Sequence, residues 1–417
     1  MPFFFSRAAC GSLGLVSLLA ACGGSSSIEA PVASAPVVTQ IVGGTVSAMT
    51  AGLVLQNNGA DDLRLMANGG FAFASALSAG SNYNVTVRLN PPFQLCSVSN
   101  GTGTMGSADI TNIGVTCVDG VQVSTFAGGV AGNLDANGTS ARFSTPLGVA
   151  VDADGNLLVT DVDNNSLRKI TPAGDVTTLA TGLARPFGVT VSQGRIFVTS
   201  ENGNKVLEVH PVTGVATEFM LDTPLDRPRG LVADEAGNLY VSEYGQRIRK
   251  ISPLGAVTTL AGSGMIGTDD GQGTAASFYN PAYLAIDAAG NVYVADQNGP
   301  TIRKITPTGD VTTLAGSGAM GTTDGPGATA TFREPVGMAM GSDGMVYMSD
   351  HSGQMIRRIA ADGTVSSVAG QSVFAGSDDG AGSVARFNYP AGIAFDAEGT
   401  LYVIDALGNR VRKLTRN

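Results

Sequence analysis

Short runs of alternating apolar and polar residues, separated by turn residues, fill the part of the chain between residues 37 and 119. Clear examples lie at 53–55, 71–73 and 83–88, and Asn-Gly pairs stand between several runs. Strands spaced about eight to twelve residues apart are typical of small β-sandwiches, because alternate side chains point to opposite faces of a strand. We therefore predict a small β-sandwich over residues 37–119.

From residue 121 onward a longer pattern repeats six times. Each unit holds an apolar strand after a proline, a tight turn of the Asp-x-x-Gly-Asn kind, and a second apolar strand that mostly ends in Asp or Glu. A third strand of the Ile-Arg-Lys-Ile kind, a Pro-x-Gly turn and a Val-Thr-Thr-Leu strand complete the unit. Four strands per repeat predict one blade of a β-propeller. The units begin at Pro146, Pro186, Pro228, Pro281, Pro335 and Pro390.

The strand count also predicts how the ring closes. The sequence ends at Leu414–Asn417, directly after the sixth third strand, so the last unit lacks a fourth strand of its own. Val123–Gly128 has the sequence of that missing strand, since it matches Val257–Gly262 and Val311–Gly316. We expect this N-terminal strand to pair with the last unit, because the pairing removes an open sheet edge. The ring should therefore have six blades.

The repeated pattern Pro-x-Gly-(Val/Ile)-Ala-(Val/Ile)-Asp-x-x-Gly-Asn-(Leu/Val)-Tyr-Val-x-Asp, followed by (Ile/Leu)-Arg-Lys-Ile, resembles the NHL repeat. The resemblance covers residues 123–417 and is weakest in the second unit, at 192–195 and 207–210. It implies an all-β chain in which a small β-sandwich precedes a six-bladed, NHL-like β-propeller over residues 121–417.

The first 22 residues carry a targeting signal. Arg7 precedes a short apolar run, 13–19, and the segment ends in Leu-Ala-Ala-Cys at Cys22. This ending resembles a bacterial lipobox, which implies cleavage before Cys22 and lipidation of that residue; an ordinary secretory signal is the alternative. No Asp follows Cys22, which by resemblance to lipoprotein sorting favours the outer membrane. Residues 23–36, rich in Ser, Gly, Pro and Ala, should form a flexible tether.

Cysteine usage and charge agree with export. Cys10 lies in the signal and Cys22 takes lipid, so Cys96 and Cys117 remain as a pair. An oxidising compartment favours a disulfide between them, and two buried reduced thiols are the alternative. The formal net charge of −10 argues against nucleic acid as a partner. We expect a monomer that contacts the membrane through its lipid anchor only.

The connections between strands concentrate loops on one face of the predicted disc, called here the loop-rich face. Loops from the second to the third strand share that face with the loops between blades. Two blade-to-blade connections, 181–185 and 221–227, are short, so this face should be walled but open beside the second and third blades. The opposite face has only short turns, and we expect little concavity there. The four long connections are 129–145, 262–280, 316–334 and 370–389.

Two sets of charged residues are candidate ligand-binding groups on the loop-rich face. Arg185, Arg227 and Arg229 flank the prolines at the short connections and suit an anion or carboxylate, with solvated rim charges as the alternative. Acids at the ends of the second strands suit a cation or basic ligand. Alternatively, each acid caps its own loop through backbone N–H groups. These acids are Asp161, Glu201, Glu243, Asp296, Asp350 and Asp405.

The long loops share an Asp-Gly-x-Gly motif that ends in Ala-x-Phe, seen at 269–278, 323–332 and 378–387. Its carboxylates suit Ca²⁺, but Asp-Gly is also a common turn pair. We predict no cofactor and keep Ca²⁺ as the alternative.

Two classes of function stay open. The preferred one is an extracytoplasmic, lipid-anchored binding scaffold for a protein, peptide or glycan on the loop-rich face. The alternative is a gluconolactonase-like or lyase-like propeller enzyme with a divalent metal at the axis. The amidating lyases with NHL-like propellers use zinc held by histidines. This chain has two histidines, His210 and His351, at unlike places in their units, which excludes a three-His site. We predict no catalytic residue.

Overall fold

A computed structural model describes residues 39–49, 52–91 and 93–416. The predicted signal and lipobox, 1–22, and the predicted tether, 23–36, lie outside the described residues. The described part is all-β, and its helical elements are two short 3-10 turns, η1 (Gly138–Ser140) and η2 (Gly273–Ala275). No helix in this part is long and apolar enough to cross a membrane.

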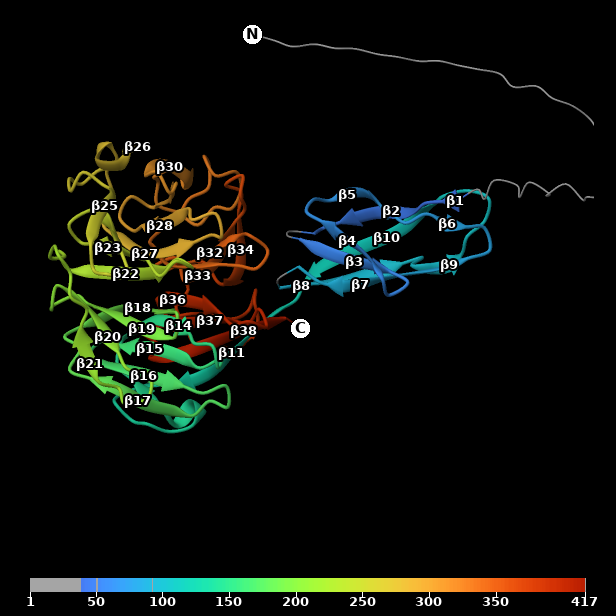
Figure 1. Cartoon of the computed structure of the whole chain (residues 1–417). Coiled ribbons are helices and arrows are strands. Elements are labelled where there is room, and N and C mark those ends of the chain that lie inside the picture. Colours follow the sequence, from blue (N-terminus) through green and yellow to red (C-terminus); the bar gives the residue numbers. More distant parts are fainter. Residues whose placement is uncertain (1–38, 50–51, 92, 417) are drawn as a thin grey trace, which may run out of the picture.

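The N-terminal strands form two four-stranded sheets, β5-β2-β10-β8 and β4-β3-β7-β9, and the short pair β1-β6 (Figure 1). Val42, Leu53, Leu55 and Ile113 are fully buried in the core of this unit. The strands are β1 (Thr39–Gln40), β2 (Val42–Ser47), β3 (Leu53–Asn57), β4 (Asp61–Leu65), β5 (Gly69–Ala72), β6 (Leu77–Ser78), β7 (Asn82–Leu89), β8 (Gln94–Ser99), β9 (Thr102–Thr104) and β10 (Ile110–Asp119).

A disulfide joins Cys96 on β8 to Cys117 on β10, and the predicted pairing is confirmed. The two residues are directly opposite each other in the antiparallel pairing of these strands, and both are buried. The bond therefore ties neighbouring strands of one sheet.

The rest of the chain forms six sheets around an axis, and the predicted six-bladed propeller is confirmed (Figure 1). Blades 1 to 3 are β14 (Pro146–Val151), β15 (Leu157–Asp161), β16 (Ser166–Ile170) and β17 (Val176–Thr181); β18 (Pro186–Ser192), β19 (Arg195–Ser200), β20 (Lys205–Val209) and β21 (Ala216–Glu218); and β22 (Pro228–Ala233), β23 (Leu239–Glu243), β24 (Arg247–Ile251) and β25 (Val257–Ala261).

Blades 4 to 6 complete the ring. They are β27 (Pro281–Ile286), β28 (Val292–Asp296), β29 (Thr301–Ile305) and β30 (Asp310–Ala315); β31 (Pro335–Met340), β32 (Val346–Asp350), β33 (Met355–Ile359) and β34 (Val365–Gly370); and β36 (Pro390–Phe395), β37 (Leu401–Asp405), β38 (Arg410–Arg416) and β11 (Val121–Gly128). The inserted loops add the short strands β12 (Val130–Ala131), β13 (Arg142–Phe143), β26 (Gly271–Gln272) and β35 (Gly380–Ala381).

The sixth sheet closes as the strand count predicted. β11 pairs antiparallel with β38, from Val121 opposite Arg416 to Gly128 opposite Arg410. The N-terminal end of the propeller sequence therefore supplies the outer strand of the C-terminal blade.

The inner strands approach one another so closely that glycine is needed at their third residue. In five blades a Cβ atom at this position would clash with a backbone carbonyl oxygen of the next inner strand. These glycines are Gly148, Gly188, Gly230, Gly337 and Gly392. Blade 4 has Tyr283 instead.

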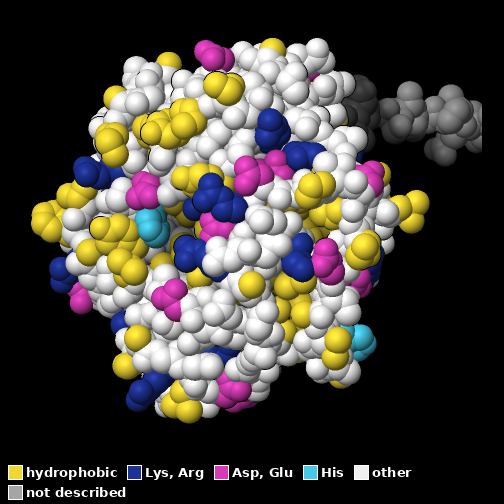
Figure 2. Space-filling model, turned by 90° about the vertical axis from the view of Figure 1, so that its left-hand side faces the viewer, with side chains coloured by type: hydrophobic (Ala, Val, Ile, Leu, Met, Phe, Trp, Pro, Cys, Tyr) yellow, Lys and Arg dark blue, Asp and Glu magenta, His cyan; other side chains and the backbone are white. Residues whose placement is uncertain are grey.

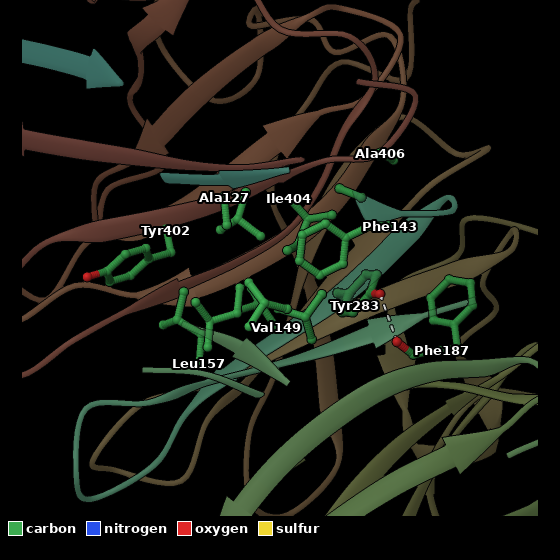
Figure 3. Close-up of a cluster of buried hydrophobic side chains, with 14 of the residues drawn as sticks. Ala127, Phe143, Val149, Leu157, Phe187, Tyr283, Tyr402, Ile404 and Ala406 are labelled. Carbon is green, nitrogen blue, oxygen red and sulfur yellow. Dashed lines mark hydrogen bonds between the residues drawn. The ribbon is translucent and has the colours of Figure 1, made fainter. Parts of the chain in front are cut away.

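Tyr283 blocks the axis together with Phe187 of blade 2. The two rings lie 5.1 Å apart, and the Tyr283 hydroxyl donates a hydrogen bond of 3.1 Å to the Phe187 carbonyl oxygen (Figure 3). Both residues belong to a hydrophobic cluster that also includes Phe143 and Val149. We call this pair the axial plug.

A cavity of about 260 Å³ lies on the short-turn side of the plug. Its lining comes from the second halves of all six inner strands, such as 149–151, 189–191 and 338–340. The expectation that this side has little concavity was therefore wrong. The expectation was based only on the lengths of the turns, whereas the side chains along the axis determine how large the cavity is.

Candidate functional site

Four buried arginines hold the inserted loops onto their own blades. Each bridges the acid at the end of the second strand, with closest distances of 2.8 to 3.7 Å, and an acid of the inserted loop, at 2.6 to 2.7 Å. Each guanidinium also lies 5.0 to 5.4 Å from the ring of the phenylalanine that ends the loop. We call these contacts the arginine latches. They join Arg168 to Asp161 and Asp135, Arg303 to Asp296 and Asp270, Arg357 to Asp350 and Asp324, and Arg412 to Asp405 and Asp379.

In three of the four inserted loops the latch acid is the Asp of the shared Asp-Gly pair, whereas in the first loop it is Asp135, which Ala136 follows. In the part of the chain that the structure describes, no three or more His, Cys, Asp or Glu side chains are grouped so that they could hold a metal ion.

The strand-end acids also cap loops through backbone N–H groups. Asp161 accepts a 2.7 Å hydrogen bond from the N–H of Ser144, and Asp296 accepts an equal one from Tyr279. Asp161, Glu243, Asp296, Asp350 and Asp405 have no exposed surface, so a ligand in solution cannot reach them. Of the six predicted acids, Glu201 alone stays a candidate. Burial raises the pKa of Asp296 to about 7.

Glu201 is not the strand-end residue of blade 2. β19 ends at Ser200, which pairs with Pro186 as Asp161 pairs with Pro146. Glu201 comes one residue later, and we call this place in each blade the post-strand position. The six residues there are Val162, Glu201, Tyr244, Gln297, His351 and Ala406. They are polar in blades 2 to 5 and apolar in blades 1 and 6.

Arg229, the second residue of β22, lies above the axial plug. Its guanidinium is 4.5 Å from the centre of the Phe187 ring. Nη1 donates to Asn280 Oδ1 at 2.8 Å and to Gln297 Oε1 at 3.2 Å. The corresponding residues of the other inner strands are all apolar: Leu147, Phe187, Ala282, Val336 and Ala391.

Arg185 shares the carboxylate of Glu201 with Arg229. Its Nε lies 2.5 Å from Glu201 Oε2, whereas Arg229 Nε is 3.9 Å from Oε1. Arg227 instead stacks over the ring of Tyr244, 3.6 Å from its centre. Arg185 and Arg227 precede prolines and have left-handed backbone, with φ of 62° and 46°. Their side chains are 46% and 48% exposed, so both can reach a ligand.

The polar contacts continue into blade 5. Gln297 Nε2 donates to Glu334 Oε1 at 2.6 Å. The ring of His351 lies 5.0 Å from that of Tyr389, and its Nδ1 is 3.0 Å from the carbonyl oxygen of Pro390. Burial lowers the pKa of His351 although the negative charge of Glu334 opposes this, so the imidazole is neutral at pH 7.

We define the axial site as the predicted Arg185, Arg227, Arg229 and Glu201 together with four residues that the repeat analysis did not single out as ligand-binding: Tyr244, Gln297, Glu334 and His351. On the face of the propeller turned away from the sandwich, basic and acidic side chains gather near the centre (Figure 2). An alignment of the six units by their strand ends would have exposed the post-strand position, because residue type changes there from blade to blade.

Comparisons with known proteins agree with this fold. Residues 143–170 match the family described as NHL repeat. A curated relative, Protein SUPPRESSOR OF QUENCHING 1, chloroplastic, of Arabidopsis thaliana, is 33% identical over 94 residues, which are 22% of this chain and only 9% of that protein. With the six sheets, the repeat match supports an NHL-repeat β-propeller.

Solved structures with the same fold cover most of the chain. A protein of unknown function from Bacteroides thetaiotaomicron VPI-5482 is 24% identical with a TM-score of 0.64, covering 88% of this chain and 90% of that one. Two auxiliary nutrient binding proteins, from the same organism and from Bacteroides ovatus ATCC 8483, are 18% and 16% identical with TM-scores of 0.59 and 0.60. They cover 87% and 88% of this chain and 90% and 91% of their own.

Proposed function

We propose that this protein is an extracytoplasmic binding protein that holds a ligand at the axial site of its propeller. The single observation that carries the proposal is the post-strand position, where the polar residues Glu201, Tyr244, Gln297 and His351 stand in four successive blades. The arginine latches recur because each of the four blades that carry them has an inserted loop that must be held in place. Side chains that differ between otherwise equal blades and reach the surface are not needed for the repeat, which favours a role in binding.

Burial of Arg229 supports the same conclusion. A charged side chain at the propeller axis costs desolvation energy, and the other five inner strands avoid that cost with apolar residues. The surrounding Asn280, Gln297 and Phe187 hold the guanidinium in one place. A charge that is held rigidly at a partly open surface is suited to binding.

The proposed location is the outer membrane, through a lipid on Cys22. The Cys96–Cys117 disulfide supports export, since such bonds persist in oxidising compartments. Intact mass of the membrane-extracted protein tests the anchor: a chain beginning at Cys22 and carrying acyl groups is expected, and an unmodified N-terminus would reject it.

A thermal-shift screen of sugars, sugar acids, amino acids and dipeptides tests the binding function. A true ligand should raise the unfolding temperature of the wild-type protein. Tyr244→Ala and His351→Ala should reduce that shift, because both remove side chains of the axial site. Met320→Ala, on an exposed part of an inserted loop, is the matched control and should keep it. A ligand whose shift survives both axial variants binds elsewhere and contradicts the proposal.

A further inference from the structure

Arg229 differs from the four latch arginines in what surrounds its charge. Each latch guanidinium contacts two carboxylates, one of them at 2.6 to 2.7 Å. Arg229 is hydrogen-bonded to the neutral amides of Asn280 and Gln297, and its nearest carboxylate, Glu201, is 3.9 Å away. Buried cations in proteins are normally paired with anions, so the charge of Arg229 is incompletely compensated.

The free donors of Arg229 and Arg185 point to the missing partner. Among the described residues, Nη2 of Arg229 donates to none, and the ion pair of Arg185 with Glu201 uses its Nε. The side chain of Arg229 remains 13% exposed, so a small group can reach it. Burial, which outweighs the attraction of Glu201, lowers the pKa of Arg229, as expected for a cation that lacks a close anion.

The charges around the site also favour an anion. Arg185 and Arg229 share one carboxylate, that of Glu201, and Glu334 is hydrogen-bonded to Gln297. The third arginine, Arg227, lies 3.9 Å from the exposed carboxylate of Asp226. Arginine binds carboxylates through charge-assisted hydrogen bonds in a planar fork, which lysine or amides cannot reproduce.

We propose that the axial site takes the carboxylate group of a small organic acid, bound by Arg229 and Arg185 beside Glu201. This inference rests on the proposed function and specifies its ligand class. Tyr244, with Arg227 stacked on it and its side chain exposed, offers an aromatic surface for the body of the same ligand.

Matched pairs of charged and neutral probes test the inference on the full mature chain. Isothermal titration would compare glucuronate with glucose, glutamate with glutamine, and benzoate with benzamide. At least one carboxylate should bind, and its neutral partner should bind about tenfold more weakly or worse, because one charge-assisted hydrogen bond is lost. If none of these carboxylates binds at millimolar concentration, the inference is overturned.

Three variants locate the bound carboxylate. Arg229→Met keeps an apolar stem on Phe187 and should weaken carboxylate binding about ten- to a hundredfold. Arg185→Met changes a half-exposed side chain, so it should fold normally, and it should weaken binding about tenfold. Glu201→Gln removes the negative charge between them and should strengthen binding about fivefold. Arg142→Met, an exposed arginine on an inserted loop, is the control and should change nothing.

The outcomes separate this inference from the proposed function. Equal binding of a charged probe and its neutral partner, or unchanged carboxylate affinity in Arg229→Met and Arg185→Met, overturns the inference. If that same binding is still lost in Tyr244→Ala, the axial site remains the binding site and only the ligand class is wrong. A Glu201→Gln variant that binds the carboxylate no more tightly removes the placement beside Glu201.

Discussion

Blades 1, 4, 5 and 6 differ from blades 2 and 3 in what surrounds the arginine position of the third strand. In the first group an inserted loop folds over its own blade, and its acid completes an arginine latch. In blade 3 no such loop is present: Arg249 contacts Glu243 alone, at 3.2 Å, and is 12% exposed. Blade 2 replaces the arginine with Leu207 and places an Arg195–Glu208 pair nearby.

The difference shows that a blade can form without a latch, and that in the latched blades the strand-end acids and the third-strand arginines are buried. In a latched blade the charged groups contact one another inside the protein, and the inserted loop covers them. The two unlatched blades follow short connections, which carry Arg185 and Arg227, and Arg229 is the second residue of the inner strand of blade 3. The sector without inserted loops therefore holds the three arginines and Glu201, whereas Gln297, Glu334 and His351 of the axial site come from the latched blades 4 and 5.

The largest effect is expected from opening the ring. Deletion of residues 121–128 removes β11 and should expose β38 as a sheet edge, so that the latched blade 6 loses an outer strand and its contacts with blade 1. We expect a loss of the cooperative unfolding transition, or a large drop in its temperature, because a closed ring supports each blade from both sides. Calorimetry measures this. Unchanged unfolding would show that the ring does not depend on its closure.

A smaller effect is expected from removing one latch arginine. Arg303→Met in blade 4 leaves Asp296 buried without its cation and should cost about 3 to 5 kcal/mol of unfolding free energy. Arg249→Met in unlatched blade 3 is the matched control and should cost less, about 1 to 2 kcal/mol, because Arg249 has one acid partner and some solvent contact. Urea unfolding gives both values. Equal losses of unfolding free energy would mean that the acid of the inserted loop adds no stability beyond the contact between the third-strand arginine and the strand-end acid.

The two acids on Arg303 should respond to pH in opposite ways. Burial raises the pKa of Asp296 to about 7, above its unfolded value of 3.8. The folded state then holds a proton that the unfolded state has released. The stability from this group is therefore present below about pH 4 and is lost as the pH rises toward 7, by up to about 1.4 kcal/mol per pH unit.

Asp270 has the opposite shift. Burial alone would raise its pKa, but hydrogen bonds from Arg303 and Thr313 outweigh burial and lower the pKa. Its contribution is present above the unfolded pKa and is lost as the pH falls. Comparison of Asp296→Asn and Asp270→Asn with wild type over pH 3 to 8 should thus remove slopes of opposite sign. Parallel pH profiles for the two variants would contradict the assignment.

The repeated features of the molecule could be predicted from sequence because the same pattern occurs in six units. Turn residues and alternating strands determine the six blades, and the copy of the fourth strand at 123–128 identifies the closing strand. The disulfide was predicted from the expected export of the chain. Each of these predictions depends on a local sequence pattern or on the number of strands or cysteines. Tertiary packing did not change the elements that these patterns predict.

The features that the sequence reading missed depend on single departures from the repeat. Ser200 replaces the strand-end acid in blade 2, which made Glu201 look equivalent to Asp161 and hid the post-strand position. Tyr283 stands where five blades have glycine, but the distance that its side chain crosses cannot be read from a pattern. The cavity on the short-turn side is lined by side chains of all six inner strands, Tyr283 among them, so turn lengths could not predict it.

The way in which β10 leads into β11 has a mechanical consequence. One residue, Gly120, separates the last strand of the sandwich from the strand that closes the ring. A pull that acts through the sandwich would enter the propeller along β11. The hydrogen bonds between β11 and β38, from Val121–Arg416 to Gly128–Arg410, would then bear the force in shear, sharing it rather than breaking one after another. The strand that completes the last blade is thus also the point where tension on the chain is carried.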